Sequence, residues 1–425
     1  MRIAIIGDLQ NDTVDNIKKI ADDINTLSPD YVIALGDYGM YNKMGTFESF
    51  RDIAEAFRDV KCEKFVPLLG NHDVQFENGE IRYTPGTVYA NYEKAFGCPP
   101  DTRIIETENL VICCVHLNPQ TKDRYIHINE CTVSDDRFED IKNKLNKINN
   151  KPIIMITHTP PSCAEILCVP GVHIRATNAY LDQDHDIFRW EKLARDNRNI
   201  VMWFSGHYHM GHDYPKSINI KDGLAYMTTG CPVCASRDGQ FHSRIIDTDG
   251  KNIIVRTFDH RTKTLRGTVD YSCPSDYCRG EYAQTYAPLC IGSGNVINAK
   301  MGMNGKLYIM TDNGYLWETD LMHRYTAGTI HYSQKYALDD FILSDNSIYR
   351  ICGDKMFRHD MSDPQRFMRE YDHPDCRFET SDIHTVEECT YTDFHYDKDT
   401  NSFVYNNKSY RFLTDEAGTL WIKAN

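Results

Sequence analysis

Five polar clusters decide the fold of this chain: Gly7-Asp8-Leu9-Gln10, Gly36-Asp37, Gly70-Asn71-His72-Asp73, Thr157-His158 and Gly206-His207-Tyr208-His209. Each directly follows a short apolar run, at Ile3 to Ile6, Tyr31 to Leu35, Phe65 to Leu69, Ile153 to Ile156 and Ile200 to Phe204. Short apolar runs that end at turn residues are typical of buried strands. The polar side chains are therefore expected at the carboxyl ends of strands, where open α/β sheets place their ligands.

Length and composition indicate a globular protein with two domains. The chain has 425 residues, of which 41% are hydrophobic and 25% charged, and this length exceeds that of one typical domain. No apolar stretch approaches the ~20 residues that cross a bilayer. The first residues lead directly into the first polar cluster, so no cleaved signal peptide is expected. The 15 cysteines are odd in number and scattered, which favours reduced thiols in a cytoplasmic protein.

The net charge of −14 constrains the partners. Sequence-independent binding to a nucleic-acid backbone needs basic patches, so it is not expected to be strong here. A small phosphate ester or nucleotide substrate remains compatible with the charge. We expect no membrane partner.

The pattern along the chain divides near residue 265. Apolar residues recur at helical spacing after strand-like runs, in the segments 17–24, 47–57 and 138–148, and capping signals precede the first and last of them at Thr13 and Ser134. This alternation predicts a layered α/β domain over residues 1–265. Residues 266–293 are predicted to be a linker or an irregular segment.

Residues 294–425 are predicted to form a β-rich domain of unknown role. Asn304-Gly305 lies between two strand-like runs and is a strong hairpin signal. Hairpins that end in an aromatic residue recur before Trp317 and Trp421. Such repeats favour propeller-like blades, whereas their uneven spacing fits a β-sandwich equally well.

The five clusters supply the ligands of two metal ions. Carboxylate and amide oxygens suit hard divalent cations, and imidazole suits zinc, iron and manganese. Two metals ~3.5–4 Å apart share a bridging ligand, for which Asp37 is the natural candidate. We expect the remaining ligands to divide into Asp8, Gln10 and His209 for one metal and Asn71, His158 and His207 for the other.

The order of the clusters resembles the calcineurin-like metallophosphoesterase superfamily over residues 1–260. The resemblance implies a four-layer α/β/β/α sandwich with the metals at the strand ends. It also implies that His72 is not a ligand but protonates the leaving group. Asp73 would orient His72 by a hydrogen bond, or would only cap the following turn.

Gln10 departs from the family pattern, which most often has histidine at this position. An amide oxygen is a harder and weaker ligand than imidazole, so the first site should favour manganese, magnesium or iron over zinc. The sequence therefore predicts two divalent cations (Mn, Fe, Mg or Zn) without fixing their identity.

The predicted reaction is hydrolysis of a phosphodiester or a phosphomonoester. The metals would lower the pKa of a bound water towards ~7, and the hydroxide would attack phosphorus in line, with His72 as general acid. The compact first domain resembles the cyclic-nucleotide phosphodiesterase branch, which favours a diester. Possible substrate contacts lie in loops that we expect to face the site, at Tyr38, Tyr41, His116, Asn118 and Arg124, and a structural role is the alternative for each of them.

Two other roles stay open. The chain could be a catalytically weak scaffold or binding protein on the same fold, since the superfamily includes scaffolding members such as a retromer subunit. The β domain could also recruit a protein or polymer partner to the phosphoesterase.

Overall fold

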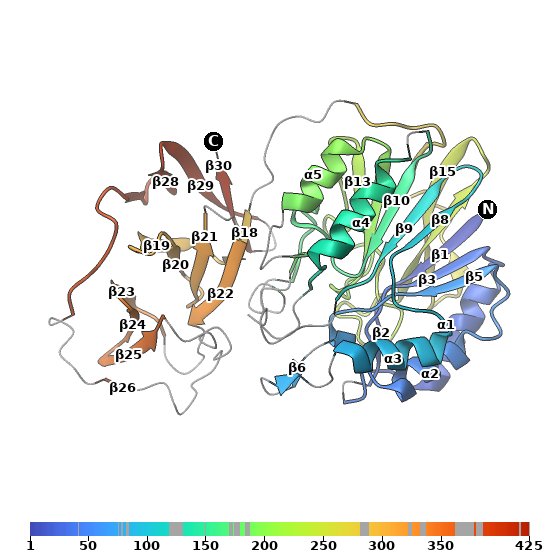
Figure 1. The fold of residues 1–425 in the computed structure, drawn as a ribbon, viewed down its shortest axis with the longest axis horizontal. Coiled ribbons are helices and arrows are strands. Elements are labelled where there is room, and N and C mark those ends of the chain that lie inside the picture. Colours follow the sequence, from blue (N-terminus) through green and yellow to red (C-terminus); the bar gives the residue numbers. More distant parts are fainter. Residues whose placement is uncertain are drawn as a thin grey trace. The chain divides into compact units, whose positions relative to one another are not determined.

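The computed structural model describes residues 1–40, 42–74, 76–77, 80–81, 85–118, 131–148, 150–169, 173, 179–182, 188–280, 289–321, 325–331, 337–361, 378–379, 386–415 and 418–424. The chain divides into two compact units (Figure 1). The N-terminal unit comprises Met1–Asp123, Cys131–Leu167 and Trp190–Gln284, and the C-terminal unit comprises Arg124–Glu130, Cys168–Arg189 and Thr285–Asn425. The domain boundaries drawn from the sequence stay a prediction.

The first sheet of the N-terminal unit is mixed. Its strand order is β16-β15-β14-β1-β3-β5, and β17 also pairs with β15. The strands are β1 (Arg2–Ile6), β3 (Tyr31–Ala34), β5 (Lys64–Pro67), β14 (His242–Thr248), β15 (Asn252–Asp259), β16 (Thr264–Leu265) and β17 (Tyr271–Pro274). β1, β3 and β5 are parallel, and Ala34 pairs with both Ile6 and Pro67. Their carboxyl ends therefore lie level at one edge.

The second sheet is also mixed, in the order β12-β13-β11-β10-β9-β8. The strands are β8 (Arg103–Glu106), β9 (Val111–Val115), β10 (Ile153–Thr157), β11 (Ile200–Ser205), β12 (Ile218–Lys221) and β13 (Leu224–Thr228). The four central strands are parallel. Thr157 pairs with Ser205, so His158 and Gly206 leave the sheet at the same level.

Alternating side chains of β1 separate two apolar cores. Ile3 and Ile5 pack in one cluster with Ile154 and Phe204 of the second sheet, because successive side chains of a strand point to opposite faces. The intervening residues Ala4 and Ile6 pack instead against the helices α1 (Val14–Asn25), α2 (Phe47–Ala56) and α3 (Pro85–Phe96). The site-bearing strands are thus fixed from both sides.

Five helices flank the sheets of the N-terminal unit in the described residues (Figure 1). They are α1 (Val14–Asn25), α2 (Phe47–Ala56), α3 (Pro85–Phe96), α4 (Asp135–Leu145) and α5 (Phe188–Asp196). The hydroxyls of Thr13 and Ser134 accept from backbone N–H groups at the starts of α1 and α4, as the sequence predicts. Trp190 of α5 contacts Phe138 of α4 and Trp203 of β11, which fixes α4 and α5 against the second sheet.

Short elements lie beyond the strand ends. β2 (Leu9–Gln10) and β4 (Tyr38–Gly39) form a parallel pair. Two 3₁₀ turns, at His72–Val74 and Ser162–Ala164, and the hairpin β6 (Phe76–Glu77) and β7 (Glu80–Ile81) complete the unit. The segments that carry the polar clusters are therefore short and tied directly to strands.

The C-terminal unit contains three antiparallel sheets. They are β19-β20-β21-β22, β23-β24-β25-β26 and β18-β30-β29-β28-β27. The strands are β18 (Leu289–Ser293), β19 (Val296–Met301), β20 (Leu307–Thr311), β21 (Leu316–Asp320), β22 (Tyr325–His331), β23 (Asp340–Ser344), β24 (Ser347–Cys352), β25 (Lys355–Asp360), β26 (Phe378–Glu379), β27 (Tyr396–Asp397), β28 (Ser402–Tyr405), β29 (Lys408–Thr414) and β30 (Thr419–Ala424). The predicted hairpin at Asn304-Gly305 joins β19 to β20.

The predicted combination of a mixed α/β part with a β-rich C-terminal part is confirmed. Within the described ranges, no helix has the length and apolar character that crossing a membrane requires.

Candidate metal centre

The predicted ligands come together at the carboxyl ends of five strands. Asp8, Asp37 and Asn71 follow β1, β3 and β5, and His158 and His207 follow β10 and β11. All seven side chains are buried, with exposed fractions of 0% for Asp8, Asp37, Asn71 and His158 and at most 5% for Gln10, His207 and His209. Polar groups so completely withdrawn from water need strong partners.

One group of potential ligand atoms lies on Asp8, Asp37 and His209, all within 4.8 Å of one another. Asp8 Oδ1 is 3.1 Å from His209 Nε2. The amide nitrogen of Gln10 lies 3.0 Å from the same ring nitrogen. The first predicted ligand set is therefore assembled.

A second group consists of Asp37, His158 and His207, also within 4.8 Å. Asn71 Oδ1 lies 2.9 Å from His158 Nε2 and 3.0 Å from His207 Nδ1. Both groups contain Asp37, so the structure forms a candidate dinuclear site around this carboxylate.

A backbone carbonyl group fixes the orientation of the His158 ring. Its Nδ1 lies 2.8 Å from the carbonyl oxygen of Leu35. A ring that donates Nδ1–H to a carbonyl presents Nε2 to the centre, an arrangement that metal-binding histidines share.

The pKa shifts show that the buried carboxylates and His158 stabilise each other's charged forms. Burial acts to lower the pKa of His158, but the carboxylates of Asp37 and Asp8 raise it to about 9. Burial acts to raise the pKa of Asp37, but His158 and His72 outweigh it and lower the pKa. Metal binding to such ligands displaces protons.

Unsatisfied oxygen atoms test whether the centre fits cations. Among the described residues, Gln10 Oε1 is buried without a hydrogen-bond partner, and Asp37 Oδ2 lies 3.4 Å from His158 Nε2. Leaving an acceptor such as Gln10 Oε1 unpaired costs about 1–3 kcal/mol. Oxygen and imidazole atoms that converge on one space, one of them an oxygen without a partner, fit divalent cations.

Three of the predicted ligands have left-handed backbone conformations, with φ of 55° at Asp37, 71° at His207 and 53° at His209. Such conformations are uncommon for residues other than glycine and persist only where the surroundings hold them. Gly70 is one such constraint, because a Cβ there would lie 2.2 Å from Asp37 Oδ1.

His72 differs from the ligands because its side chain is only half-buried. Its backbone N–H donates to Asp37 Oδ1 over 2.9 Å. The backbone of His72 is thus tied to the centre, while its ring is not one of the grouped ligands.

Asp73 is buried and binds backbone groups. Its carboxylate accepts from the N–H groups of Asp37, Tyr38 and Gly70 over 2.8–3.1 Å. Burial and the nearby Asp37 carboxylate raise the pKa of Asp73 to about 7. These contacts tie Asp73 to residues 37, 38 and 70, and both the capping of the following turn and the orienting role towards His72 stay predictions.

Two of the possible substrate contacts have structural surroundings, the alternative that the sequence left open. Tyr38 is fully buried and its hydroxyl donates to Ala34 O, because β4 turns the ring into the core beside Phe50. His116 is also fully buried, against Tyr92.

Asn118 has a structural contact as well. Its Oδ1 accepts from the backbone N–H of Ser134, the residue that caps α4. Tyr41 and Arg124 lie outside the described residues.

The segment of residues 231–242 joins β13 to β14 and borders the predicted ligands. It contains Cys231-Pro232-Val233-Cys234, which has the spacing of a redox pair, but without a second CxxC and without a helix after it the sequence favours a structural or incidental role. In the structure Cys231 Sγ donates to Asp8 O and Cys234 Sγ to Asn11 O. No local sequence signal indicates these contacts, because the partners are more than 220 positions apart.

One family profile matches the N-terminal part of the chain. Residues 1–211 match the family profile described as calcineurin-like phosphoesterase. No curated protein matches the chain.

Solved structures resemble the chain at low identity. Purple acid phosphatase PPD1 from yellow lupin (Lupinus luteus) seeds is 13% identical with a TM-score of 0.46, over 67% of this chain and 56% of the lupin chain. A dimetal phosphatase from Danio rerio is 10% identical with a TM-score of 0.44, over 65% of this chain and 99% of its own. Vps29 from Entamoeba histolytica, complexed with zinc, is 10% identical with a TM-score of 0.29, over 65% and 99%.

The chain thus spans only about half the length of the lupin phosphatase. The family assignment depends on the sequence profile, whose range includes every predicted ligand. Through residues 1–211, this chain belongs to the calcineurin-like phosphoesterase family.

Proposed function

We propose that the protein is a dinuclear-metal-dependent phosphoesterase that hydrolyses a phosphodiester, or alternatively a phosphomonoester. The observation that carries the proposal is the pair of buried ligand groups that share Asp37. In this proposal Asp8, Gln10 and His209 hold one cation and Asn71, His158 and His207 hold the other. The proposal includes the four-layer α/β/β/α sandwich that the family resemblance implies for the N-terminal part. The topology of the C-terminal sheets, propeller-like or sandwich, is left open.

Two bound cations would acidify a water and neutralise charge on the phosphoryl oxygens. The chain's own residues perform the remaining steps. His72, half-buried and fixed through its N–H to Asp37 Oδ1, donates a proton to the departing oxygen. General acid catalysis of this kind contributes typically ~10²–10⁴-fold. Asp73 accepts from the backbone N–H groups of Asp37 and Gly70 and so fixes the two segments that carry Asp37 and His72.

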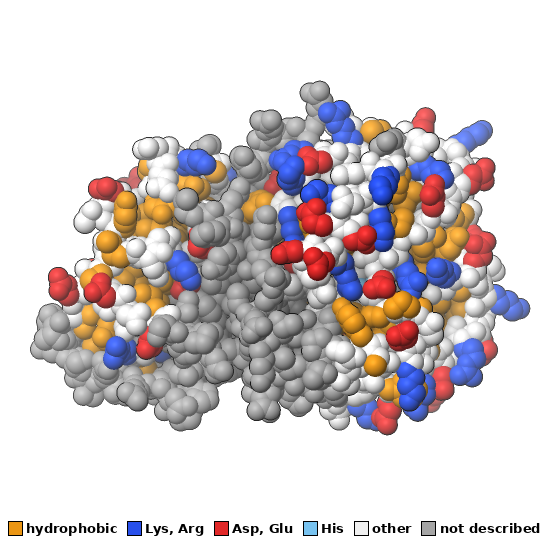
Figure 2. All heavy atoms as spheres, in the orientation of Figure 1, with side chains coloured by type: hydrophobic (Ala, Val, Ile, Leu, Met, Phe, Trp, Pro, Cys, Tyr) orange, Lys and Arg blue, Asp and Glu red, His pale blue; other side chains and the backbone are white. Residues whose placement is uncertain are grey.

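Small esters are the substrates that we favour. Figure 2 shows basic and acidic side chains interspersed over the visible face of the N-terminal unit. Together with the net charge of −14, this supports a small phosphate ester or nucleotide over a nucleic-acid backbone. Likeness to the cyclic-nucleotide phosphodiesterase branch supports a diester, and the amide of Gln10 supports manganese, iron or magnesium over zinc.

Hydrolysis of bis(p-nitrophenyl) phosphate and p-nitrophenyl phosphate tests the proposal. Metal-stripped protein is assayed after addition of manganese, magnesium, iron or zinc. We expect metal-dependent release of nitrophenol, faster from the diester. Asp37→Ala should abolish it, because both ligand groups lose their shared carboxylate.

The His72→Ala variant distinguishes a general acid from a metal ligand. It should lower the rate with an alkyl leaving group much more than with p-nitrophenolate, which leaves readily without a proton. The metal content should stay unchanged. Loss of bound metal in this variant would contradict the assignment of His72.

A scaffold role for the same centre is the alternative. The presence of the half-buried His72 next to all seven ligands favours catalysis over this alternative, because metal binding alone does not need it. Protein that binds two metals but hydrolyses neither ester with any of the four cations would support a scaffold or a highly selective enzyme.

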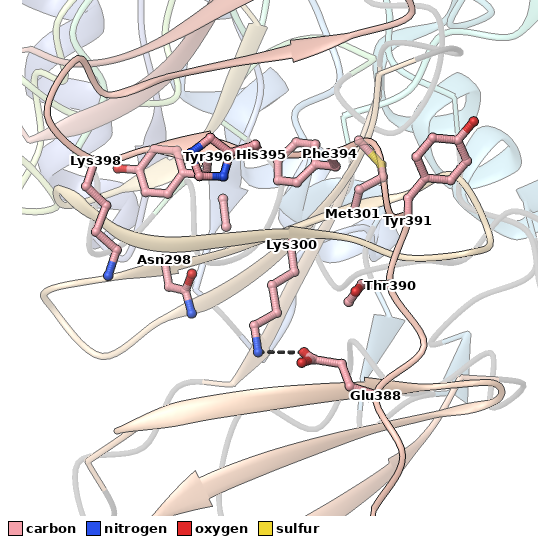
Figure 3. A pocket seen from close by; sticks show the side chains of 11 residues that line it. Asn298, Lys300, Met301, Glu388, Thr390, Tyr391, Phe394, His395, Tyr396 and Lys398 are labelled. Atoms are coloured by element: carbon pink, nitrogen blue, oxygen red, sulfur yellow. Dashed lines mark hydrogen bonds and ion pairs between the residues drawn. The ribbon is translucent and has the colours of Figure 1, made fainter.

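A recruiting role for the C-terminal unit has one specific observation in its favour. A cavity of about 230 Å³ opens between β19 and residues 388–398 (Figure 3). Lys300 is paired with Glu388 at 2.7 Å, whereas Lys398 forms no ion pair with any described residue. Lys398→Ala should spare hydrolysis of the small diester and slow hydrolysis of a phosphorylated protein such as phosphocasein. If Lys398→Ala hydrolysed both substrates at the wild-type rates, this recruiting role would be contradicted.

A further inference from the structure

The segment of residues 231–242, here termed the clasp, touches both parts of the chain that supply the first ligand group. It connects β13 to β14 and lies beside the residues that follow β1. Cys231 Sγ donates to Asp8 O over 3.4 Å, and Cys234 Sγ donates to Asn11 O over 2.8 Å. The backbone N–H of Cys234 donates to Asp12 Oδ2 over 3.0 Å. The Asp8–Gln10 segment is thus tied to the clasp on either side of Gln10.

The other end of the clasp holds the segment of residues 208–212. The N–H of Arg237 donates to His209 O over 2.9 Å, and its Nη1 donates to Tyr208 O over 2.6 Å. Asp238 Oδ2 accepts from Gly211 N over 2.8 Å. His242 Nδ1 accepts from His212 N over 3.1 Å. Four hydrogen bonds therefore fix the backbone around His209.

This backbone needs external support. His209 has a φ of 53°, a left-handed conformation that the chain does not favour on its own. His207 is held separately, because its N–H donates to the Asp8 carboxylate. Asn71 and His158 follow β5 and β10, outside the clasped segments. The clasp contacts therefore concentrate on the ligands Asp8, Gln10 and His209.

We infer that the clasp positions the first metal site, and that Asp238 is a positioning residue for its ligand His209. The inference rests on the proposed two-metal function. The clasp contacts the segments that carry Asp8, Gln10 and His209, so the affinity of the first site depends on how well the clasp holds these ligands. Loosening the clasp should therefore empty the first site before the second.

Gly211 offers an independent perturbation of the same contact. A Cβ on Gly211 would lie 2.4 Å from Gln240 Cβ. Gly211→Ala should therefore push the 208–212 segment away from the clasp. Shortening the opposing side chain in Gly211→Ala/Gln240→Gly removes the collision.

The test measures Mn²⁺ bound per full-length chain by calorimetry and elemental analysis. Wild type should bind two ions. Asp238→Ala and Gly211→Ala should weaken one of the two sites by roughly 10–100-fold, as loss of an outer-shell contact does, and leave the other unchanged. Asp238→Asn keeps one acceptor oxygen for Gly211 N but not the second one, which accepts from Ser236 and Gln240 N, so it should restore the affinity in part. Gly211→Ala/Gln240→Gly should restore it fully.

Asp249→Ala is the matched control. Asp249 Oδ1 accepts from Lys251 N and Asn252 N in the turn after β14, the same kind of contact at the opposite end of that strand. A seven-residue strand places it about 20 Å from His242. The control variant should bind two ions like wild type, and the urea unfolding of all metal-free variants reports any general loss of stability.

The outcomes separate the two claims. Two ions in wild type together with unaltered affinity in Asp238→Ala and Gly211→Ala would overturn the positioning role alone. An equal loss in Asp249→Ala, or a loss from both sites together, would also overturn it. A wild-type chain that binds no Mn²⁺ would refute the proposed function, and the inference with it.

Discussion

Gly70→Ala perturbs the shared carboxylate without removing any ligand. A Cβ at this position would lie 2.2 Å from Asp37 Oδ1 and 2.6 Å from Asp37 N. Real Cβ atoms essentially never approach within 3.0 Å. The carboxylate must therefore move by at least about 0.8 Å, and misplacement of a catalytic group by ~1 Å costs on the order of 10²-fold in rate. Overpacking adds a loss of about 1–3 kcal/mol in the free energy of unfolding.

The assay compares kcat/KM for bis(p-nitrophenyl) phosphate, bound Mn²⁺ and urea unfolding in wild type and variant. Gly267→Ala is the matched control, because a Cβ there meets nothing within 4 Å. We expect a decrease of about 100-fold or more in Gly70→Ala, and wild-type behaviour in Gly267→Ala. Wild-type kcat/KM and metal content in Gly70→Ala would refute the reasoning that Asp37 needs this position.

Three further predictions concern His116, Asp73 and Gln10. Burial lowers the pKa of His116 well below its usual value of 6.5, so the folded state keeps it neutral while the unfolded chain gains a proton as the pH falls. The free energy of unfolding should then fall below pH 6.5 by up to about 1.4 kcal/mol per pH unit. Urea unfolding at pH 7 and pH 5.5 should show a smaller loss of this free energy in His116→Leu than in wild type. Equal losses in the two proteins would contradict the prediction. Asp73→Ala leaves three buried N–H groups without their acceptor, which should lower the free energy of unfolding by at least about 3 kcal/mol, whereas Asp73→Asn should lose less; intact stability with lost activity would instead support orientation of His72. Gln10→His should raise the affinity for zinc relative to manganese in calorimetric titrations, and an unchanged preference would show that Gln10 is not a ligand.

The metal centre was largely predictable from sequence because its signals are local. Each ligand follows an apolar run, and parallel strands of one sheet end at one edge, so the clusters after β1, β3 and β5 meet, as do those after β10 and β11. The apolar core between the two sheets then brings the two sets together. The capping residues Thr13 and Ser134 similarly marked the helix starts.

Other features depend on contacts between distant residues. Tyr38 follows the shared ligand Asp37 and was expected to face the site, but the pairing of β4 with β2 turns its ring into the core. Asp73 was expected beside His72, yet its carboxylate accepts from the N–H groups of residues 35 and 36 positions away. The clasp joins residues more than 220 positions apart, and a cysteine or aspartate in a turn gives no local sign of such a partner.

Electron paramagnetic resonance of the Mn²⁺-loaded protein tests the central claim most directly. Two Mn²⁺ ions ~3.5–4 Å apart that share one carboxylate are magnetically coupled. We predict two ions per chain with a coupled spectrum in wild type and loss of the coupling in Asp37→Ala. Uncoupled ions in wild type, or a coupled pair that survives Asp37→Ala, would contradict a centre built around Asp37.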